Sequence, residues 1–157
     1  MIFRDAVRGD VPAIVALLAD DALGAGREAP VGAEGDLDDA YWSAFDQVQA
    51  DPRNRVIVAA AGGRVVGTLQ LTLIPGLSRH GMLRAQVEGV RVAASHRAQG
   101  LGHAMIEWAI AQARAAGCGL VQLTSDKQRP GAIRFYESLG FAATHEGLKL
   151  SLERRPS

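Results

Sequence analysis

A pair of glycines between two apolar segments constrains the fold of this chain more than any other feature. Gly62 and Gly63 separate residues 55–61 (RVIVAAA) from residues 64–74 (RVVGTLQLTLI). Both segments are rich in residues that favour strands, and a Gly-Gly pair accepts the positive φ angles of a tight hairpin turn. The sequence therefore predicts two antiparallel strands, which places a sheet at the centre of the fold.

The segments before this hairpin predict one more strand and two helices. Residues 2–6 form the strand, and Asp10 caps a first helix that has one apolar face. Residues 22–36 contain four glycines and a proline, which predicts a loop. A second helix is expected to start near Asp36.

The segments after the hairpin alternate between strands and helices. A strand over 83–92 leads into a helix that ends near Gly117, and a buried strand over 120–125 leads into a helix with Pro130 in its first turn. A last strand pair is expected at 141–143 and 148–152. Because antiparallel hairpins come first and a β-α-β crossover follows, we expect an α/β fold. It would be a single domain over 1–157, with a mixed, mostly antiparallel central sheet and helices on both faces.

The strand over 83–92 changes parity in its middle. Its apolar residues occupy odd positions in the first half and even positions in the second: Leu83, Ala85 and Val87, then Val90 and Val92. Side chains on a strand alternate with period two, so one extra residue would keep both halves facing the core. The sequence therefore predicts a β-bulge at Glu88, Gly89 or Val90, which would splay the sheet there.

Composition and charge exclude several classes of function. The 157 residues carry 17 basic and 17 acidic side chains, so we expect neither a nucleic acid nor a membrane as partner. The single Cys118 cannot form an internal disulfide, and the four histidines lack metal-ligand spacing. No signal-like amino terminus or membrane-spanning segment is visible, so we expect a cytoplasmic protein without a metal.

The segment from Arg97 to Gly102 places two glycines between a predicted strand and a helix. Glycine leaves the backbone N–H groups of a helix start accessible, and the helix dipole favours an anion there. The segment lacks the Gly-x-x-x-x-Gly-Lys-Ser/Thr pattern of ATP-binding loops, and Met105 stands where a dinucleotide fingerprint has its third glycine. A Gly-x-Gly turn alone is a weak signal; it favours a phosphate group that belongs to neither ATP nor NAD.

Two motifs resemble the signatures of the GCN5-related N-acetyltransferase (GNAT) family. Arg97-x-x-Gly100-x-Gly102, after a strand that ends in VRV, is similar to the family's Gln/Arg-x-x-Gly-x-Gly/Ala motif. Residues 132–141 (AIRFYESLGF) resemble the second signature, a helix that carries a tyrosine shortly before a Gly-Phe pair. The resemblance implies a GNAT-like fold, acetyl-CoA as the donor co-substrate, and transfer of its acetyl group to an amine.

The resemblance also implies which residues bind acetyl-CoA. The glycine-rich loop would hold the pyrophosphate, and the strand before it would pair with the pantetheine arm. Arg129 stands where many family members have asparagine, and it either binds the cofactor or is solvated at a helix start. The implied cofactor-binding residues are Val90, Arg91, Val92, Arg97, Ala98, Gln99, Gly100, Leu101, Gly102, His103, Arg129 and Tyr136.

Acetyl transfer needs a base for the amine, a donor for the oxyanion and an acid for the leaving thiolate. Glu88 lies nine residues before Arg97, where a subset of the family carries a glutamate, and is the candidate base. Its alternative role is that of a surface carboxylate or an ion-pair partner. Tyr136 stands at the position of the family's thiolate-protonating tyrosine, and its alternative role is that of a core aromatic. A backbone N–H freed at the bulge would meet the oxyanion.

The leading interpretation is an N-acetyltransferase for a primary amine of a small molecule, acting by direct attack in a ternary complex. A protein acetyltransferase for lysine or N-terminal amines is the first alternative, and it would need an open groove. A non-catalytic CoA-binding sensor is an alternative from another class. The residues leave homodimer formation open, and they do not identify the acceptor amine.

Overall fold

A computed structural model describes residues 1–28, 36–129 and 131–153. Part of the predicted loop, residues 29–35, and Pro130 lie outside these ranges. The chain divides into two compact units, Met1–Leu123 and Thr124–Ser157, and each has its own architecture.

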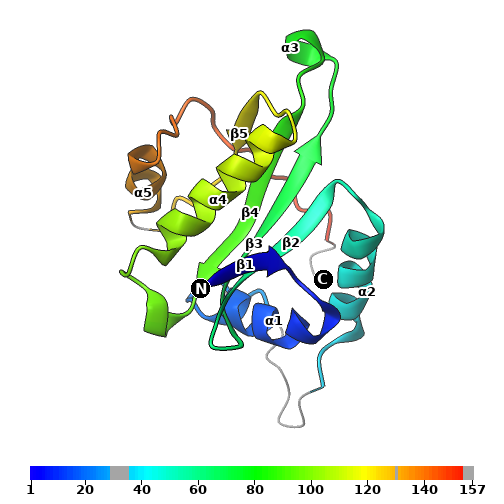
Figure 1. Cartoon of the computed structure of the whole chain (residues 1–157), viewed down its shortest axis with the longest axis vertical. Helices are drawn as coiled ribbons and strands as arrows, with labels where there is room; N and C mark the ends of the chain where they lie inside the picture. Colours follow the sequence, from blue (N-terminus) through cyan, green and yellow to red (C-terminus); the bar gives the residue numbers. More distant parts are fainter. Residues whose placement is uncertain (29–35, 130, 154–157) are drawn as a thin grey trace. The chain divides into compact units, whose positions relative to one another are not determined.

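The first unit contains a sheet of five strands in the order β1-β2-β3-β4-β5 (Figure 1). The strands are β1 Ile2–Asp5, β2 Asn54–Ala61, β3 Arg64–Ile74, β4 Arg84–Val92 and β5 Leu120–Gln122. The first three pairings are antiparallel, and β4 pairs with β5 in parallel. The predicted mixed, mostly antiparallel sheet is confirmed, although its last strand is shorter than predicted. Gly62 and Gly63 form the hairpin turn with φ of 55° and 78°.

The predicted bulge is also present in β4. Gln70 of β3 faces Glu88, whereas Thr68 faces Arg91, so two residues of β4 oppose a single residue of β3. Gly89 has a φ of 60°, the left-handed conformation that glycine adopts at such bulges. Because of the extra residue, the apolar side chains of the second half of β4 lie on the same face of the sheet as those of the first half, as the sequence pattern predicted.

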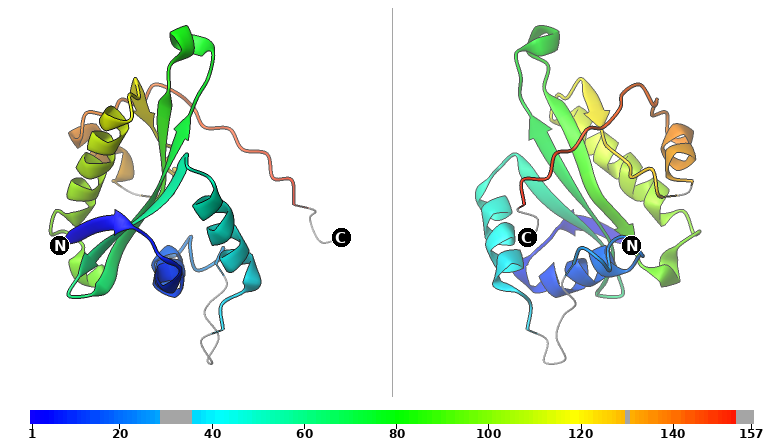
Figure 2. Two further views of the ribbon diagram at one scale, coloured as in Figure 1. Left: turned by 45° about the vertical axis from the view of Figure 1, so that its right-hand side comes forward. Right: turned by 180° about the vertical axis from the view of Figure 1, so that it is seen from behind.

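Helices cover both faces of this sheet (Figures 1 and 2). Helices α1 (Val11–Ala19) and α2 (Asp39–Ala50) pack on one face, where Phe45 and Val58 belong to a shared apolar core. Helix α4 (Leu101–Ala115) packs on the other face, so tightly that a Cβ atom on Gly67 would lie 2.7 Å from the Met105 sulfur. The loops hold a short helical turn, α3 (Ser78–Gly81), and two 3-10 turns, Arg8–Asp10 and Ala94–His96.

The starts of the first two helices differ in detail from the prediction. The Asp10 carboxylate does not cap α1; it accepts the backbone N–H of Val7 at 2.9 Å and pairs with Arg4 at 2.6 Å. The Arg4 hydrogen bond lowers the pKa of Asp10 below its ordinary value. Helix α2 begins at Asp39, with Asp38 as its cap, rather than near Asp36.

The second unit holds one helix, α5 (Ala132–Ser138), among its described residues. The predicted strands at 141–143 and 148–152 are wrong, because no strand follows Gln122 in the described part of the chain. Leu148, Leu150 and Leu152 alternate as in a strand, yet they are 93%, 86% and 90% exposed. An alternating pattern makes a segment able to pair, but a strand also requires a partner strand, and the pattern does not supply one.

Candidate functional site

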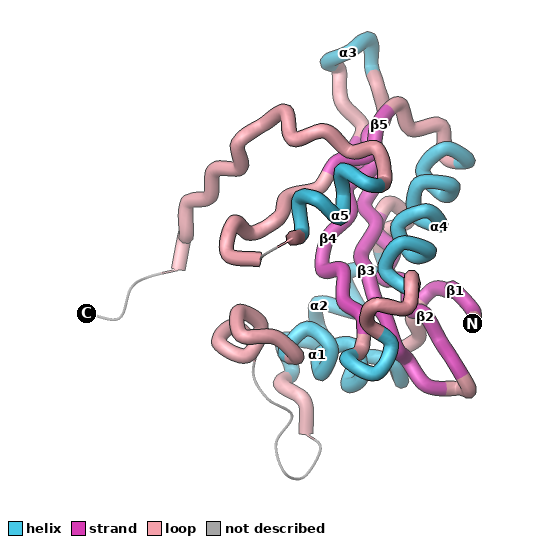
Figure 3. The backbone as a smooth tube through the Cα atoms, turned by 90° about the vertical axis from the view of Figure 1, so that its left-hand side faces the viewer, coloured by secondary structure: helices cyan, strands magenta, loops and turns pink. Residues whose placement is uncertain are grey.

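The sheet opens between β4 and β5. Their parallel pairing joins Arg84 to Leu120 and ends where Gln86 faces Gln122, although β4 continues to Val92. Figure 3 shows β5 beside only the first part of β4. The second half of β4 therefore has no ladder to β5, so β5 does not satisfy the backbone groups on that edge.

The bulge lies where this opening begins, and it positions Glu88. Glu88 is exposed and faces Gln70 across the β3–β4 ladder, on the side of the sheet that carries α1 and α2. Gln86 Nε2 donates a hydrogen bond of 3.4 Å to its carboxylate. Arg91, beyond the bulge, pairs through Nε with Asp21 at 3.4 Å. The predicted base thus lies at the surface of the opened strand, and the Arg91 side chain is engaged with the segment that follows α1.

The glycine-rich loop leads directly into α4. Gly100, with φ 80°, occupies the residue position before the helix, and no side chain caps the helix start. The first hydrogen bond of the helix joins the Ala104 N–H to the Gly100 carbonyl at 3.0 Å. The N–H groups of Leu101, Gly102 and His103 come before that bond, so the helix itself gives them no acceptor. Together with the helix dipole, they make a site suited to a phosphate anion.

Neighbouring side chains hold this loop in place. Arg97 Nε donates to the Val92 carbonyl at 3.1 Å, and its Nη2 donates to the Asp20 carboxylate at 2.7 Å. Gln99 Nε2 donates to the Ser95 carbonyl at 2.9 Å. The Arg97 guanidinium, which we predicted to bind a cofactor, thus ties the loop to β4 and to the residue after α1. No local pattern predicts this contact, because Asp20 and Arg97 lie far apart in the chain.

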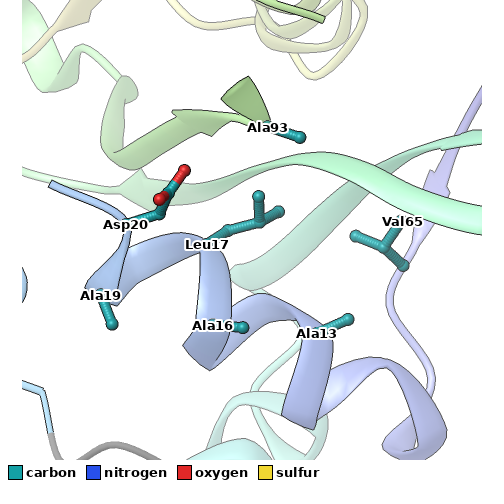
Figure 4. Close-up of a pocket in the computed structure, with 7 residues that line it drawn as sticks. All are labelled: Ala13, Ala16, Leu17, Ala19, Asp20, Val65 and Ala93. Atoms are coloured by element: carbon teal, nitrogen blue, oxygen red, sulfur yellow. The ribbon is translucent and has the colours of Figure 1, made fainter. Parts of the chain in front are cut away.

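An open hollow of about 490 Å³ lies beside the loop, between α1 and the sheet (Figure 4). Its lining residues are mostly small and apolar: Ala13, Ala16, Leu17, Ala19, Asp20, Val65 and Ala93. Asp20, its one charged residue, is the partner of Arg97. The hollow thus adjoins the loop, but its walls offer little polar chemistry of their own.

The second unit carries the other two predicted site residues. Tyr136 lies in α5, with its ring 5.0 Å from that of Phe135 and 5.7 Å from that of Phe141. The backbone N–H of Arg129 donates to the Asp126 carbonyl at 3.0 Å, just before α5. Both residues are half-buried, and the ring contacts with Phe135 and Phe141 orient the tyrosine ring.

The described ranges contain neither a candidate metal-binding cluster nor a candidate membrane-spanning helix. They contain no group of three or more His, Cys, Asp or Glu side chains that could hold a metal ion. No helix in them has both the length and the apolar character needed to cross a bilayer. Burial raises the pKa of Cys118 above its ordinary value, which lowers its reactivity as a nucleophile.

The chain matches the Acetyltransferase (GNAT) family over residues 15–141. A glucosamine 6-phosphate N-acetyltransferase of Trypanosoma brucei brucei is 37% identical over 90 residues, which cover 57% of this chain and 59% of that protein. An aminoalkylphosphonate N-acetyltransferase of Salmonella typhimurium is 29% identical over 106 residues, 68% of each chain. This chain thus matches less than two thirds of the trypanosomal relative's length.

Solved structures share the fold. A protein from Bacillus halodurans C-125 described as a transcriptional regulator is 46% identical, with a TM-score of 0.91 over 96% of this chain and 99% of that one. The expected α/β fold and the likeness suggested by the two motifs are therefore confirmed.

Proposed function

This chain belongs to the acetyltransferase (GNAT) family, and from that membership we propose that it transfers the acetyl group of acetyl-CoA to a primary amine of a small molecule. The observation that carries this proposal is the uncapped start of α4 beside the second half of β4, which has no ladder to β5. The helix start offers backbone N–H groups to a pyrophosphate, and the β4 edge offers an extended backbone to an amide-containing chain. Acetyl-CoA contains both groups.

We assign the donor contacts mainly to the backbone. The pyrophosphate lies against the loop and the first turn of α4, and the pantetheine arm pairs along β4 after the bulge. Because the side chains of Arg91 and Arg97 are engaged with Asp21 and Asp20, these arginines act mainly by fixing the backbone. The donor contact proposed for Arg129 rests on the family motif. The proposed donor-binding residues are Val90, Arg91, Val92, Arg97, Ala98, Gln99, Gly100, Leu101, Gly102, His103, Arg129 and Tyr136.

The reaction we propose is direct attack in a ternary complex. The amine nitrogen attacks the carbonyl carbon of the acetyl group, a C–N bond forms, and the C–S bond breaks. Glu88 accepts the proton that the amine loses, and Tyr136 gives a proton to the departing thiolate. A backbone N–H at the Gly89 bulge stabilises the oxyanion of the tetrahedral intermediate.

A thiol-release assay with a panel of amines tests this function. The panel contains alkylamines, amino sugars, aminophosphonates, sugar phosphates that carry an amine, and a lysine peptide. We expect turnover with a small amine and none with the peptide, in line with the substrates for which the two curated relatives are named. Turnover with the peptide alone would favour a protein acetyltransferase. Acetyl-CoA binding without turnover of any amine would favour a sensor.

We further propose that residues 1–157 act as one catalytic domain, since the family match includes residues of both units. The expected location is the cytoplasm, where acetyl-CoA is available.

We also propose a homodimer, because Leu148, Leu150 and Leu152 leave one apolar side of an extended segment exposed, and the same segment of a second copy would cover it. Sedimentation should show a dimer that Leu150→Lys dissociates; Leu77→Lys, at an equally exposed leucine, serves as the control.

A further inference from the structure

A row of polar side chains crosses four neighbouring strands of the sheet. The strand registers align Asn54 of β2 with Thr72 of β3, Thr72 with Gln86 of β4, and Gln86 with Gln122 of β5. Residues aligned across neighbouring strands lie on the same face of a sheet. We call these four residues the polar row.

Hydrogen bonds link the members of the polar row in pairs. Thr72 Oγ1 donates to Asn54 Oδ1 at 2.6 Å, and Gln122 Nε2 donates to Gln86 Oε1 at 2.8 Å. All four side chains are half-buried. Each glutamine amide has two N–H hydrogens, and these contacts leave donors and acceptors that a bound molecule can use.

The same face of the sheet has a different character beneath α1. There, Val58 is buried in the apolar core and Val65 packs against that core, while the buried Thr68, which faces Val58, donates to the Ile57 carbonyl at 3.1 Å. Half-buried polar side chains on inner strands are costly unless they gain hydrogen bonds. The change from an apolar to a polar surface along one face therefore indicates that the polar row meets something polar.

Opposite charges flank the β4–β5 part of the polar row. Gln86 Nε2 donates to the Glu88 carboxylate at 3.4 Å, which links the row to the proposed base. Arg84 Nη1 donates to Gln122 Oε1 at 3.3 Å, which adds a guanidinium beside Gln122. A carboxylate, a stretch of amide and hydroxyl groups, and a guanidinium thus follow one another along β4 and β5.

We propose that the polar row is the acceptor-binding surface, and that the acceptor is a polyhydroxylated amine that carries an anionic group. This inference rests on the proposed function, because it takes Glu88 as the base that receives the amine proton. The amine lies at Glu88, the hydroxyl groups exchange hydrogen bonds with Gln86 and Gln122, and the anionic group pairs with Arg84. An alkylamine has no hydroxyl groups with which to use the N–H donors that remain on these amides.

Thiol-release kinetics with four amines test the proposal: glucosamine 6-phosphate, glucosamine, 2-aminoethylphosphonate and butylamine. We expect kcat/KM for the amino sugar phosphate to exceed each of the others by at least tenfold. Gln122→Leu should raise the KM of glucosamine 6-phosphate about tenfold while leaving those of butylamine and acetyl-CoA unchanged. Arg84→Gln should abolish the preference for glucosamine 6-phosphate over glucosamine.

Gln112→Leu is the matched control, because Gln112 is a half-buried glutamine on α4 that accepts a hydrogen bond from Arg55 at 2.9 Å. It should leave the preference unchanged, and thermal melting should show that all three variants fold. If the variants shift the KM of every amine equally, or of none, the acceptor surface is misassigned although the acetyltransferase activity stands. If no amine turns over, calorimetry should measure the binding of glucosamine 6-phosphate to the protein in the presence of CoA. Absence of that binding at millimolar concentration overturns the proposal.

Discussion

Arg97 donates a hydrogen bond of 2.7 Å to the carboxylate of Asp20, and this contact ties the glycine-rich loop to the end of α1. A second bond from the same guanidinium, to the Asp20 carbonyl at 3.1 Å, makes the contact two-pronged. Both side chains are 50% exposed, so the pair contributes little to global stability. Its main effect is on the position of the loop.

Removal of this contact should weaken donor binding more than it weakens the fold. We expect Asp20→Ala to raise the Kd of acetyl-CoA about 3- to 10-fold, because the loop then has to be ordered when the pyrophosphate binds. Calorimetry measures the affinity, and thermal melting should show a loss of less than about 1 kcal/mol. Asp46→Ala is the control, since it breaks the exposed Arg8–Asp46 pair elsewhere on the first unit. Equal affinity in both variants would contradict the positioning role.

A negative charge in the loop should block the donor directly. Gly102→Glu places a carboxylate beside the uncapped start of α4, where it repels a pyrophosphate and competes for the same N–H groups. We expect the affinity for acetyl-CoA to fall at least tenfold while the melting temperature stays close to that of the parent. Gly102→Ala, which adds bulk without charge, should retain most of the affinity. Unchanged binding in Gly102→Glu would remove the loop from the donor site.

Local patterns in the sequence predicted the features that depend on neighbouring residues. The hairpin follows from Gly62 and Gly63, and the bulge follows from the parity change around Gly89, because glycine conformation and strand alternation act over a few residues. The helix after the glycine-rich loop was predictable for the same reason.

Features that join distant segments were not predictable. The polar row runs across four strands from Asn54 to Gln122, and no local pattern specifies the registers that align its members. The Arg97–Asp20 pair was missed for the same reason. Leu148 to Leu152 shows the converse case, in which a correct local pattern predicted a strand although no partner strand is present in the described residues. Pairing across a sheet is a property of the whole chain.

Asp10 should make stability depend on pH in the acid range. Its pKa is lowered, first by the hydrogen bond from Arg4, so the folded state binds its proton less tightly than the unfolded state does. The stabilisation is therefore complete above the unfolded pKa of about 3.9 and is lost as the pH falls through the lower folded value. Asp10→Asn should cost about 1–2 kcal/mol at pH 7 and progressively less in strong acid. Urea melts across this range measure the difference, and a constant difference would exclude the linkage.

Substitution of Tyr136 should distinguish a catalytic hydroxyl from one that only stabilises the fold. If its hydroxyl protonates the thiolate, Tyr136→Phe should lower kcat about 10²-fold and leave acetyl-CoA affinity and thermal stability nearly unchanged. Phenylalanine keeps the ring contacts with Phe135 and Phe141, so the aromatic cluster is preserved. A purely structural hydroxyl gives the opposite result, a loss of about 1 kcal/mol in stability with full turnover. Stopped-flow detection of the thiol, combined with thermal melting, distinguishes the two.

Substitution of Glu88 should change the pH dependence of turnover. An acceptor amine whose pKa lies above 7 is mostly protonated at pH 7, so a base has to remove its proton before attack. Glu88→Gln should therefore lower kcat about 10²-fold near neutral pH. The defect should shrink as the pH rises, because the amine then loses its proton to water. Asp46→Asn, at an exposed carboxylate on α2, serves as the control and should leave the pH profile of the parent intact. If Glu88→Gln keeps full activity from about pH 6.5 to pH 9.5, no carboxylate base acts at the bulge, and catalysis rests on the positioning of an amine that arrives neutral.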